Sequence, residues 1–206
     1  MPRFGVGQPL TRKEDLRLLT GRGRYVDDLS FPNQARAEFL RSPHAHARIV
    51  QIDVEKAKSA SGVCAVYVSA DIANAGLGGL PVWFMPENAP PGYAPEFPLL
   101  AQDVVRYVGE SLAMIVAESA EQAARALDLI EVKYESLPTS VGLEEAASDG
   151  APELWPGKAP FNVAFLWQGG DMSAVVTALR QAAHLVEIDV INNRVAIAAI
   201  ECRAAI

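Results

Sequence analysis

Short apolar segments, separated by glycine, proline and polar residues, run along most of the 206-residue chain. Apolar residues that alternate with polar ones, or that form brief continuous runs, are typical of β-strands. On this pattern we predict strands over residues 35–40, 48–54, 63–68, 104–108, 112–117, 131–135, 162–167 and 185–191. The run 63–68 is rich in valine and is expected to be a buried strand.

Helices are predicted where a capping residue precedes a helical pattern. A capping box at Ser119 and Gln122 begins one helix, which links the strands 112–117 and 131–135 into a β-α-β unit. Its predicted apolar face consists of Ala120, Ala123, Ala124, Leu127 and Ile130. The other predicted helices are short: residues 13–19, a helix capped by Asp53 that ends before Gly62, and residues 172–183 behind the cap Asp171. This mixture of elements indicates an α+β fold.

Residues 76–98 interrupt the pattern with six prolines and four glycines. A loop of this length inside a compact domain is usually a functional or an interaction element. It also carries Trp83, Phe84, Met85, Tyr93 and Phe97, which a solvated linker would not. We therefore interpret the loop as an interface, with these side chains partly exposed in this chain alone.

The charge of the chain is unevenly distributed. The net charge of -7 argues against general nucleic-acid binding. Residues 1–58 hold eleven Lys and Arg against seven Asp and Glu, whereas residues 59–206 hold seven against eighteen. A basic arm on an acidic body suits docking to another protein, and a solvated face explains it equally well. The sequence has neither an apolar signal core nor a membrane-length apolar window, so a cytoplasmic protein without a membrane span is expected.

Candidate metal ligands are sparse. Two cysteines cannot make a disulfide framework or a four-ligand metal site, and Cys64 is expected to be a small buried hydrophobic residue. His44 and His46 would point to one face of a strand and could share a metal. No third ligand lies nearby in the sequence and His184 is distant, so a structural role is favoured and no metal site is predicted.

The segment Gly21-Arg-Gly-Arg24 has two readings. Its glycine amides and guanidinium groups could hold an anion, or it could form a tight turn whose arginines pair with Asp27 and Asp28. The turn is favoured, because the strand-glycine-helix setting of a nucleotide site is missing. The adjacent carboxylates Asp27/Asp28 and Glu144/Glu145 would point apart and are assigned to turns or to the surface.

One resemblance adds to this picture. Residues 21–32 read Gly-Arg-Gly-Arg-Tyr-Val-Asp-Asp-Leu-Ser-Phe-Pro, and residues 37–53 contain Arg-Ser-Pro-His-Ala-His-Ala-Arg-Ile. Together they resemble the opening of the large, molybdopterin-binding subunit of the xanthine dehydrogenase/aldehyde oxidase family, nearest to carbon monoxide dehydrogenase-like large chains. The resemblance implies an arm over 1–14, a hammerhead-type mixed-sheet domain over 15–140, a linker over 141–160, and the truncated start of the first molybdopterin-binding domain over 161–206.

The resemblance also implies a function for the whole protein. It would be an oxidoreductase that hydroxylates an aldehyde, an N-heterocycle or a CO-type substrate with water, using the molybdenum cofactor molybdopterin. Electrons would pass to an iron–sulfur subunit and an FAD subunit. In the family the catalytic elements follow the position of Ile206, so no catalytic residue is assigned and this chain alone is not expected to bind the cofactor.

Two residues near the end of the chain are the only ones with an implied link to the cofactor. Glu201 and Arg203 lie in the segment that leads toward it in the family, as a pair that braces the site, and Cys202 replaces the usual proline. The chain ends inside an apolar run, which we interpret as the N-terminal piece of a larger protein or a product cut short. The alternative is a stand-alone, non-catalytic binding or assembly module with the same fold.

Overall fold

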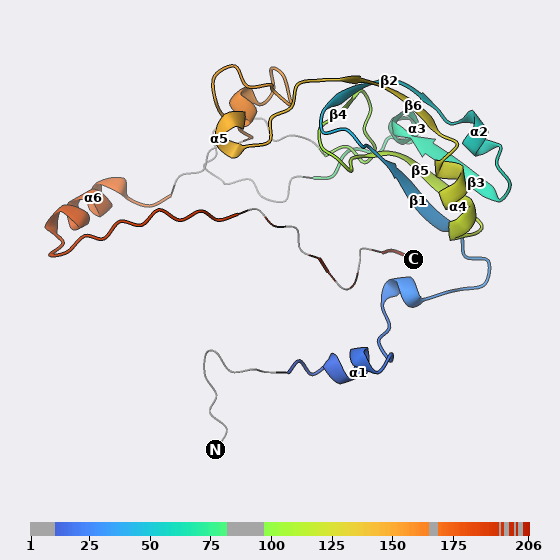
Figure 1. The fold of residues 1–206 in the computed structure, drawn as a ribbon, viewed down its shortest axis with the longest axis horizontal. Helices are drawn as coiled ribbons and strands as arrows, with labels where there is room; N and C mark the ends of the chain where they lie inside the picture. Colours follow the sequence, from blue (N-terminus) through green and yellow to red (C-terminus); the bar gives the residue numbers. More distant parts are fainter. Residues whose placement is uncertain are drawn as a thin grey trace. The chain divides into compact units, whose positions relative to one another are not determined.

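The computed structural model describes residues 11–81, 97–164, 169–193, 195, 198–199, 201 and 204–206 (Figure 1). The chain divides into two units. One consists of Ala35–Leu185, and the other of Met1–Gln34 together with Val186–Ile206. Most of the interface loop expected over 76–98, including Trp83, lies outside the described residues.

The larger unit contains two three-stranded sheets. In the first, which we call sheet A, the strand order is β1 (Arg36–Arg41), β5 (Ser111–Ala117) and β3 (Val63–Val68), and both pairings are antiparallel. The central strand β5 reads Ser-Leu-Ala-Met-Ile-Val-Ala, so it is apolar on both of its faces. A strand of this composition gains most from a central position, where neighbours pair with both of its edges.

The second sheet, sheet B, has the order β4 (Val104–Val105), β2 (Ala47–Asp53) and β6 (Glu131–Ser136), again antiparallel. In β6 and most of β2, apolar positions toward the core alternate with exposed polar positions, and the alternation in β2 is interrupted at Val50, where the pairing with β6 shifts register. On the solvent side Arg48 pairs with Glu135 at 3.4 Å, and Lys56 pairs with Glu131. Sheet B therefore has the usual pattern of an antiparallel sheet with one solvent-exposed face.

Helix α4 (Ala120–Leu127) covers one face of sheet A and packs on β1, β5 and β3. It begins as predicted: the Ser119 hydroxyl accepts a hydrogen bond from the amide of Gln122 at 3.3 Å. The predicted apolar face is partly wrong, because Ala120 and Ala124 are exposed and Ala126 is buried with Ala123. The helix is rotated so that Ala126, three residues after Ala123, meets the sheet.

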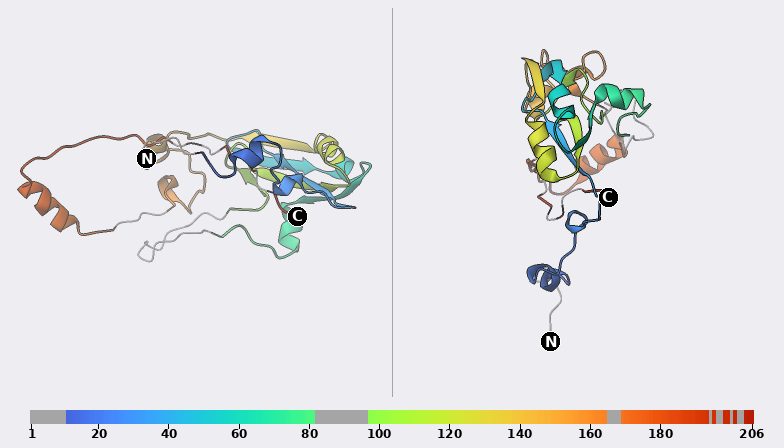
Figure 2. Two further views of the ribbon diagram at one scale, coloured as in Figure 1. Left: turned by 90° about the horizontal axis from the view of Figure 1, so that it is seen from below. Right: turned by 90° about the vertical axis from the view of Figure 1, so that its right-hand side faces the viewer.

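Two clusters of buried residues form the core. The first lies between α4, α2 (Glu55–Lys58) and sheet A, and the second joins β2, β4 and β5 around Ala47, Val105 and Leu112. Leu40 and Ile52 pack against both clusters, so the two sheets share a continuous interior. Helix α3 (Ser69–Asn74) follows β3, and in both views of Figure 2 it lies on the opposite side of the strands from α4.

The predicted strands are confirmed for β1, β2, β3, β5 and β6. The expected burial of β3 is wrong, because β3 lies at the edge of sheet A and only its Val66 is buried. The strand predicted over 104–108 ends at Val105, because the following residues turn to reach β5. Over 162–167, Asn162 belongs to the short helix η2 (Pro160–Asn162), residues 163–164 are not in a strand, and the rest are outside the described residues. The strand predicted over 185–191 is wrong: these residues pair with no described strand and are exposed.

The remaining helices are short. They are α1 (Asp15–Leu19) and η1 (Val26–Asp28) in the smaller unit, and α5 (Leu143–Ala146) and α6 (Met172–Gln181) in the larger one. Asp171 caps α6 as predicted, and accepts a hydrogen bond from the amide of Ala174 at 3.0 Å. Within the described residues, no helix has both the length and the apolar character needed to span a membrane.

Candidate functional site

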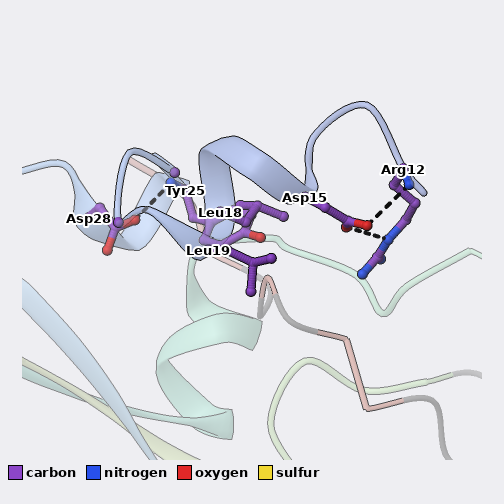
Figure 3. A pocket seen from close by; sticks show the side chains of 8 residues that line it. Arg12, Asp15, Leu18, Leu19, Tyr25 and Asp28 are labelled. Atoms are coloured by element: carbon purple, nitrogen blue, oxygen red, sulfur yellow. Dashed lines mark hydrogen bonds and ion pairs between the residues drawn. The ribbon is translucent and has the colours of Figure 1, made fainter.

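A hollow of about 540 Å³ lies next to α1 in the smaller unit (Figure 3). Its wall includes Leu18, Leu19, Tyr25 and the glycines of the predicted turn. Gly23 passes so close to α1 that a β-carbon there would lie 2.8 Å from Cδ2 of Leu18. The end of the Leu18 side chain would have to shift to make room for it, whereas Gly21, with φ of 69°, has a backbone conformation that favours glycine.

The charges in this hollow do not favour an anion. The Arg12 guanidinium pairs with Asp15 at 3.0 Å, and Asp28 accepts the main-chain amide hydrogen of Tyr25 at 2.9 Å (Figure 3). One guanidinium and two carboxylates line the wall, so the local charge is negative. Arg22 donates to the Thr20 hydroxyl at 3.2 Å. A turn at Thr20 and Gly21 ends α1, and residues 22–24 are not part of it. Asp28 is held by a main-chain amide, where pairing with an arginine was expected.

A second hollow, of about 260 Å³, is built around Arg106 and Trp155 in the larger unit. The guanidinium carbon of Arg106 lies 3.6 Å from the centroid of the Trp155 ring, a cation–π contact. The same side chain donates to the carbonyl oxygens of Leu154 at 2.9 Å and Val104 at 3.2 Å. Pro98, Gln102, Asp103 and Lys158 complete the wall. Arg106 thus joins the end of β4 to the segment around residue 155.

The turn that leads from β4 to β5 is organised by a buried carboxylate. Glu110 is only 4% exposed, and its side chain accepts the amide hydrogen of Arg106. Burial raises the pKa of Glu110, while the amide and the positive charge of Arg106 oppose that rise. The Glu110 carbonyl accepts the Ser42 amide hydrogen at 2.8 Å, and Gly109, with φ of 92°, donates to the Ser42 carbonyl.

The two histidines of the predicted pair have separate partners. His46 is 8% exposed, and its Nδ1 lies 2.7 Å from the carbonyl oxygen of Pro138. The His44 ring packs on the Tyr134 ring with centroids 4.5 Å apart, and its amide donates to the Ser42 hydroxyl at 3.0 Å. This geometry supports the structural reading of the pair. In the described part of the chain no three His, Cys, Asp or Glu side chains gather closely enough to hold a metal ion.

The remaining candidate residues belong to separate elements of the chain. Glu201 is exposed, and its carboxylate accepts the amide hydrogen of Val26 at 3.2 Å. Glu144 and Glu145 are exposed in the first turn of α5, and Asp27 and Asp28 are exposed in η1. Arg203 and Cys202 are outside the described residues.

The prediction for Cys64 is wrong, because its thiol is exposed. The pairing of β3 with β5 shifts register between Val63 and Ala65, so the intervening Cys64 has no partner residue on β5. The expectation of burial rested on the apolar neighbours in the sequence. Such neighbours do not reveal an irregularity in the pairing.

The group formed by Arg106, Glu110 and Trp155 was not predicted from the sequence. The sequence contained a signal for Glu110, because a carboxylate between two apolar strands is unusual. No local pattern indicated that Arg106 would reach Trp155, which is far away in the sequence.

None of these groups forms a cradle for a large anionic cofactor. The hollow next to α1 is lined by two carboxylates, and the hollow at Trp155 is small. Glu201, the one described residue with an implied link to molybdopterin, is exposed, and its carboxylate accepts the Val26 amide hydrogen. The described residues do not fit the cofactor, and what they form instead is a packed scaffold with polar groups that fix its turns.

The fold is an α+β arrangement of two small antiparallel sheets with α4 packed on one of them. Residues 20–138 match the family model described as the aldehyde oxidase and xanthine dehydrogenase a/b hammerhead domain. The chain belongs to this family. The resemblance that residues 21–53 suggested is thereby confirmed.

Relatives and solved structures agree with this assignment. The chain is 38% identical to the nicotine 6-hydroxylase large subunit of Paenarthrobacter nicotinovorans, over 96% of this chain and 23% of that protein. It is similar to quinoline 2-oxidoreductase from Pseudomonas putida 86, with 44% identity, a TM-score of 0.60, and coverage of 72% of this chain and 18% of that one. A Cu,Mo-CO dehydrogenase structure shows 38% identity, a TM-score of 0.57, and coverage of 73% and 18%. The chain spans less than a quarter of the length of these proteins.

Proposed function

We propose that this chain is the hammerhead part of a molybdenum hydroxylase large subunit, and that its own role is structural. The match of residues 20–138 to the hammerhead family model carries the proposal. Large subunits with similar sequences and a Cu,Mo enzyme with a similar fold support it.

The whole protein would be an oxidoreductase that hydroxylates an aldehyde, an N-heterocycle or a CO-type substrate with water. The cofactor molybdopterin would supply the redox chemistry. Residues outside this chain would hold it, with Glu201 and Arg203 bracing the approach to it. An iron–sulfur subunit and an FAD subunit in the cytoplasm would carry the electrons away. The domain limits of 15–140 for the hammerhead and 161–206 for the start of a cofactor domain belong to the same proposal.

The competing proposal is a binding or assembly module that contains the hammerhead fold and no redox centre. The well-packed core of the larger unit would allow such a module to fold without a cofactor. The two proposals differ in what must accompany the chain in the cell. The hydroxylase requires further large-subunit sequence, and the module does not.

Affinity purification of the N-terminally tagged protein from its source cells tests the choice. We expect the preparation to contain stoichiometric molybdenum, iron and flavin, together with polypeptide sequence that continues the large subunit. The recombinant 206-residue chain serves as the control and should contain no stoichiometric molybdenum. A tagged protein of only 206 residues without molybdenum, iron or flavin would favour the module. Stoichiometric molybdenum in the control would refute the scaffold role.

A further inference from the structure

The two sheets differ in the chemistry of their outer faces. The outer face of sheet B carries the charged pairs Arg48–Glu135 and Lys56–Glu131. Sheet A has its core face against α4, with Ala113, Ile115 and Ala117 all 0% exposed. Its other face would be polar if it met only water, because antiparallel sheets with one solvated face alternate apolar and polar residues.

That second face of sheet A is instead apolar, and the strand register aligns its side chains in rows. Met114 on β5 lies opposite Phe39 on β1 and opposite Tyr67 on β3. In the next row Val116 lies opposite Ala37 and Ala65. Cross-strand neighbours of this kind form one contiguous surface. We call the six residues Phe39, Met114, Tyr67, Val116, Ala37 and Ala65 the outer face of sheet A.

This outer face is only half covered. Phe39 is 40% exposed and Tyr67 is 39% exposed, whereas Leu112, at the other end of the same face of β5, is 1% exposed inside the second core cluster. The buried interior therefore continues along β5 into an apolar surface that is open. At the margin, the Arg41 guanidinium lies 5.8 Å from the Phe39 ring centroid and donates to the Gly109 carbonyl and the Ser111 hydroxyl.

Aromatic residues beside an arginine are the types that contribute most to protein interfaces. These residues also lie on paired strands, so little conformational freedom would be lost on docking. The chain spans less than a quarter of its large-subunit relatives, which leaves most of such a subunit to supply the covering segment.

We propose that the outer face of sheet A is the surface on which the remainder of the large subunit docks, through an apolar segment that covers Phe39, Met114 and Tyr67. The inference rests on the proposed function, because it requires that the remainder exists. The experiment must distinguish this occupant from two others. They are a second copy of this chain and a separate electron-transfer subunit.

Hydroxyl-radical footprinting read by mass spectrometry tests the proposal, because it reports on methionine and aromatic side chains directly. The tagged protein purified from its source is compared with the recombinant 206-residue chain. We expect oxidation of Phe39, Tyr67 and Met114 to fall at least about fivefold in the native preparation, with cross-links from this face to large-subunit sequence beyond residue 206. Equal oxidation in both samples would overturn the proposal.

Matched variants separate docking from folding. Tyr67→Lys places a charge on the outer face of sheet A, and Val50→Lys places one on β2, where Val50 is 59% exposed. Both should leave the melting temperature of the 206-residue chain unchanged within about two degrees. Only Tyr67→Lys should lower the yield of assembled native protein, severalfold. Equal yields for the two variants, or a large loss of melting temperature for Tyr67→Lys, would contradict docking at this face.

The outcomes also distinguish this inference from the proposed function. Molybdenum, iron and flavin in a preparation whose outer face is fully reactive would leave the function intact and overturn the docking surface. Protection that is already present in the 206-residue chain and disappears on dilution would identify a second copy as the occupant, and cross-links to another subunit would identify that subunit. Either result would overturn the proposal. A native protein without redox centres and with a reactive face would overturn both.

Discussion

The Arg106 guanidinium lies over the Trp155 ring, with 3.6 Å between its central carbon and the ring centroid. Because Arg106 follows β4 and Trp155 lies beyond the hammerhead match, this contact fastens the segment after residue 138 to the sheets. The hydrogen bond from Arg106 to the Leu154 carbonyl reinforces it at the same point.

We predict a measurable coupling between these two side chains. A double-mutant cycle with Arg106→Gln and Trp155→Leu should give a coupling free energy of about 0.5–1 kcal/mol or more, the range of cation–π contacts. Arg41 and Phe39, whose contact is 5.8 Å and exposed, provide the control cycle and should couple more weakly. Urea unfolding measures both cycles. A coupling at Arg106 and Trp155 no larger than the control would show that the contact adds nothing.

The buried carboxylate of Glu110 should make stability depend on pH. Burial raises its pKa in the folded protein above the ordinary value of 4.5, which the unfolded chain retains. Between these two pKa values the folded protein holds a proton that the unfolded chain has released, so the free energy of unfolding falls as the pH rises through this window. The glutamine in Glu110→Gln cannot ionise, so the variant should lack this decrease in the free energy of unfolding.

Urea unfolding at a series of pH values upward from 4.5 checks this expectation. As the pH rises, the free energy of unfolding of the unmodified protein should fall relative to that of Glu110→Gln. Above the pKa of Glu110 in the folded protein, the difference between the two should become constant. The exposed Glu118→Gln is the matched control. Parallel pH profiles for Glu110→Gln and the unmodified protein would contradict the role of burial.

Asn162 should be important for the stability of the segment around α5 and η2. Its side-chain oxygen accepts the Leu154 amide hydrogen at 2.8 Å, and its nitrogen donates to the carbonyls of Ala146 at 2.9 Å and Pro152 at 3.0 Å. Its φ of 56° is in the left-handed region. Asn162→Gly removes the hydrogen bonds and keeps the backbone free, and should cost about 1–3 kcal/mol.

Asn162→Ala removes the same bonds and also disfavours the left-handed backbone, so it should cost about 1 kcal/mol more than Asn162→Gly. Equilibrium unfolding of the two variants side by side measures the difference. Equal losses would show that the left-handed conformation is not maintained by the fold, and no loss in either variant would show that the three hydrogen bonds are replaced by water.

Residues 142–206 should be the first part of the chain to be digested by a protease. On α6 the apolar residues Met172, Val175 and Leu179 are exposed, as are Leu185 and Ile188 further on. Segments without a buried core open at low free-energy cost. Limited proteolysis with mass spectrometry should first remove α6 and the residues that follow it, and should leave a product near residues 15–140 once the segment held by Arg106 and Asn162 has also opened. A first stable product that retains 160–206 and lacks the front of the chain would refute this order.

The sequence predicted the elements whose signals are local. Ser119 and Asp171 each mark a helix start, and the apolar runs of β3 and β5 indicate strands, although the strand expected to be buried was β3 and the buried one is β5. Features that depend on partners distant in the sequence were not predicted. Cys64 is exposed because of how β3 pairs with β5, and Arg106 reaches Trp155 through the fold. The alternation over 185–191 is genuine, yet a strand requires a neighbour to pair with, and the described residues supply none.

The pairing of β1 with β5 and of β2 with β6 has a consequence for synthesis on the ribosome. Arg36 pairs with Ala117, and Asp53 pairs with Glu131. The first two strands therefore emerge long before their partners, and closing such long loops slows folding. In the interval their edges and the Phe39 side chain are open to other nascent chains. Helix α4 is the last element required by sheet A, so cotranslational folding cannot be completed before it leaves the exit tunnel.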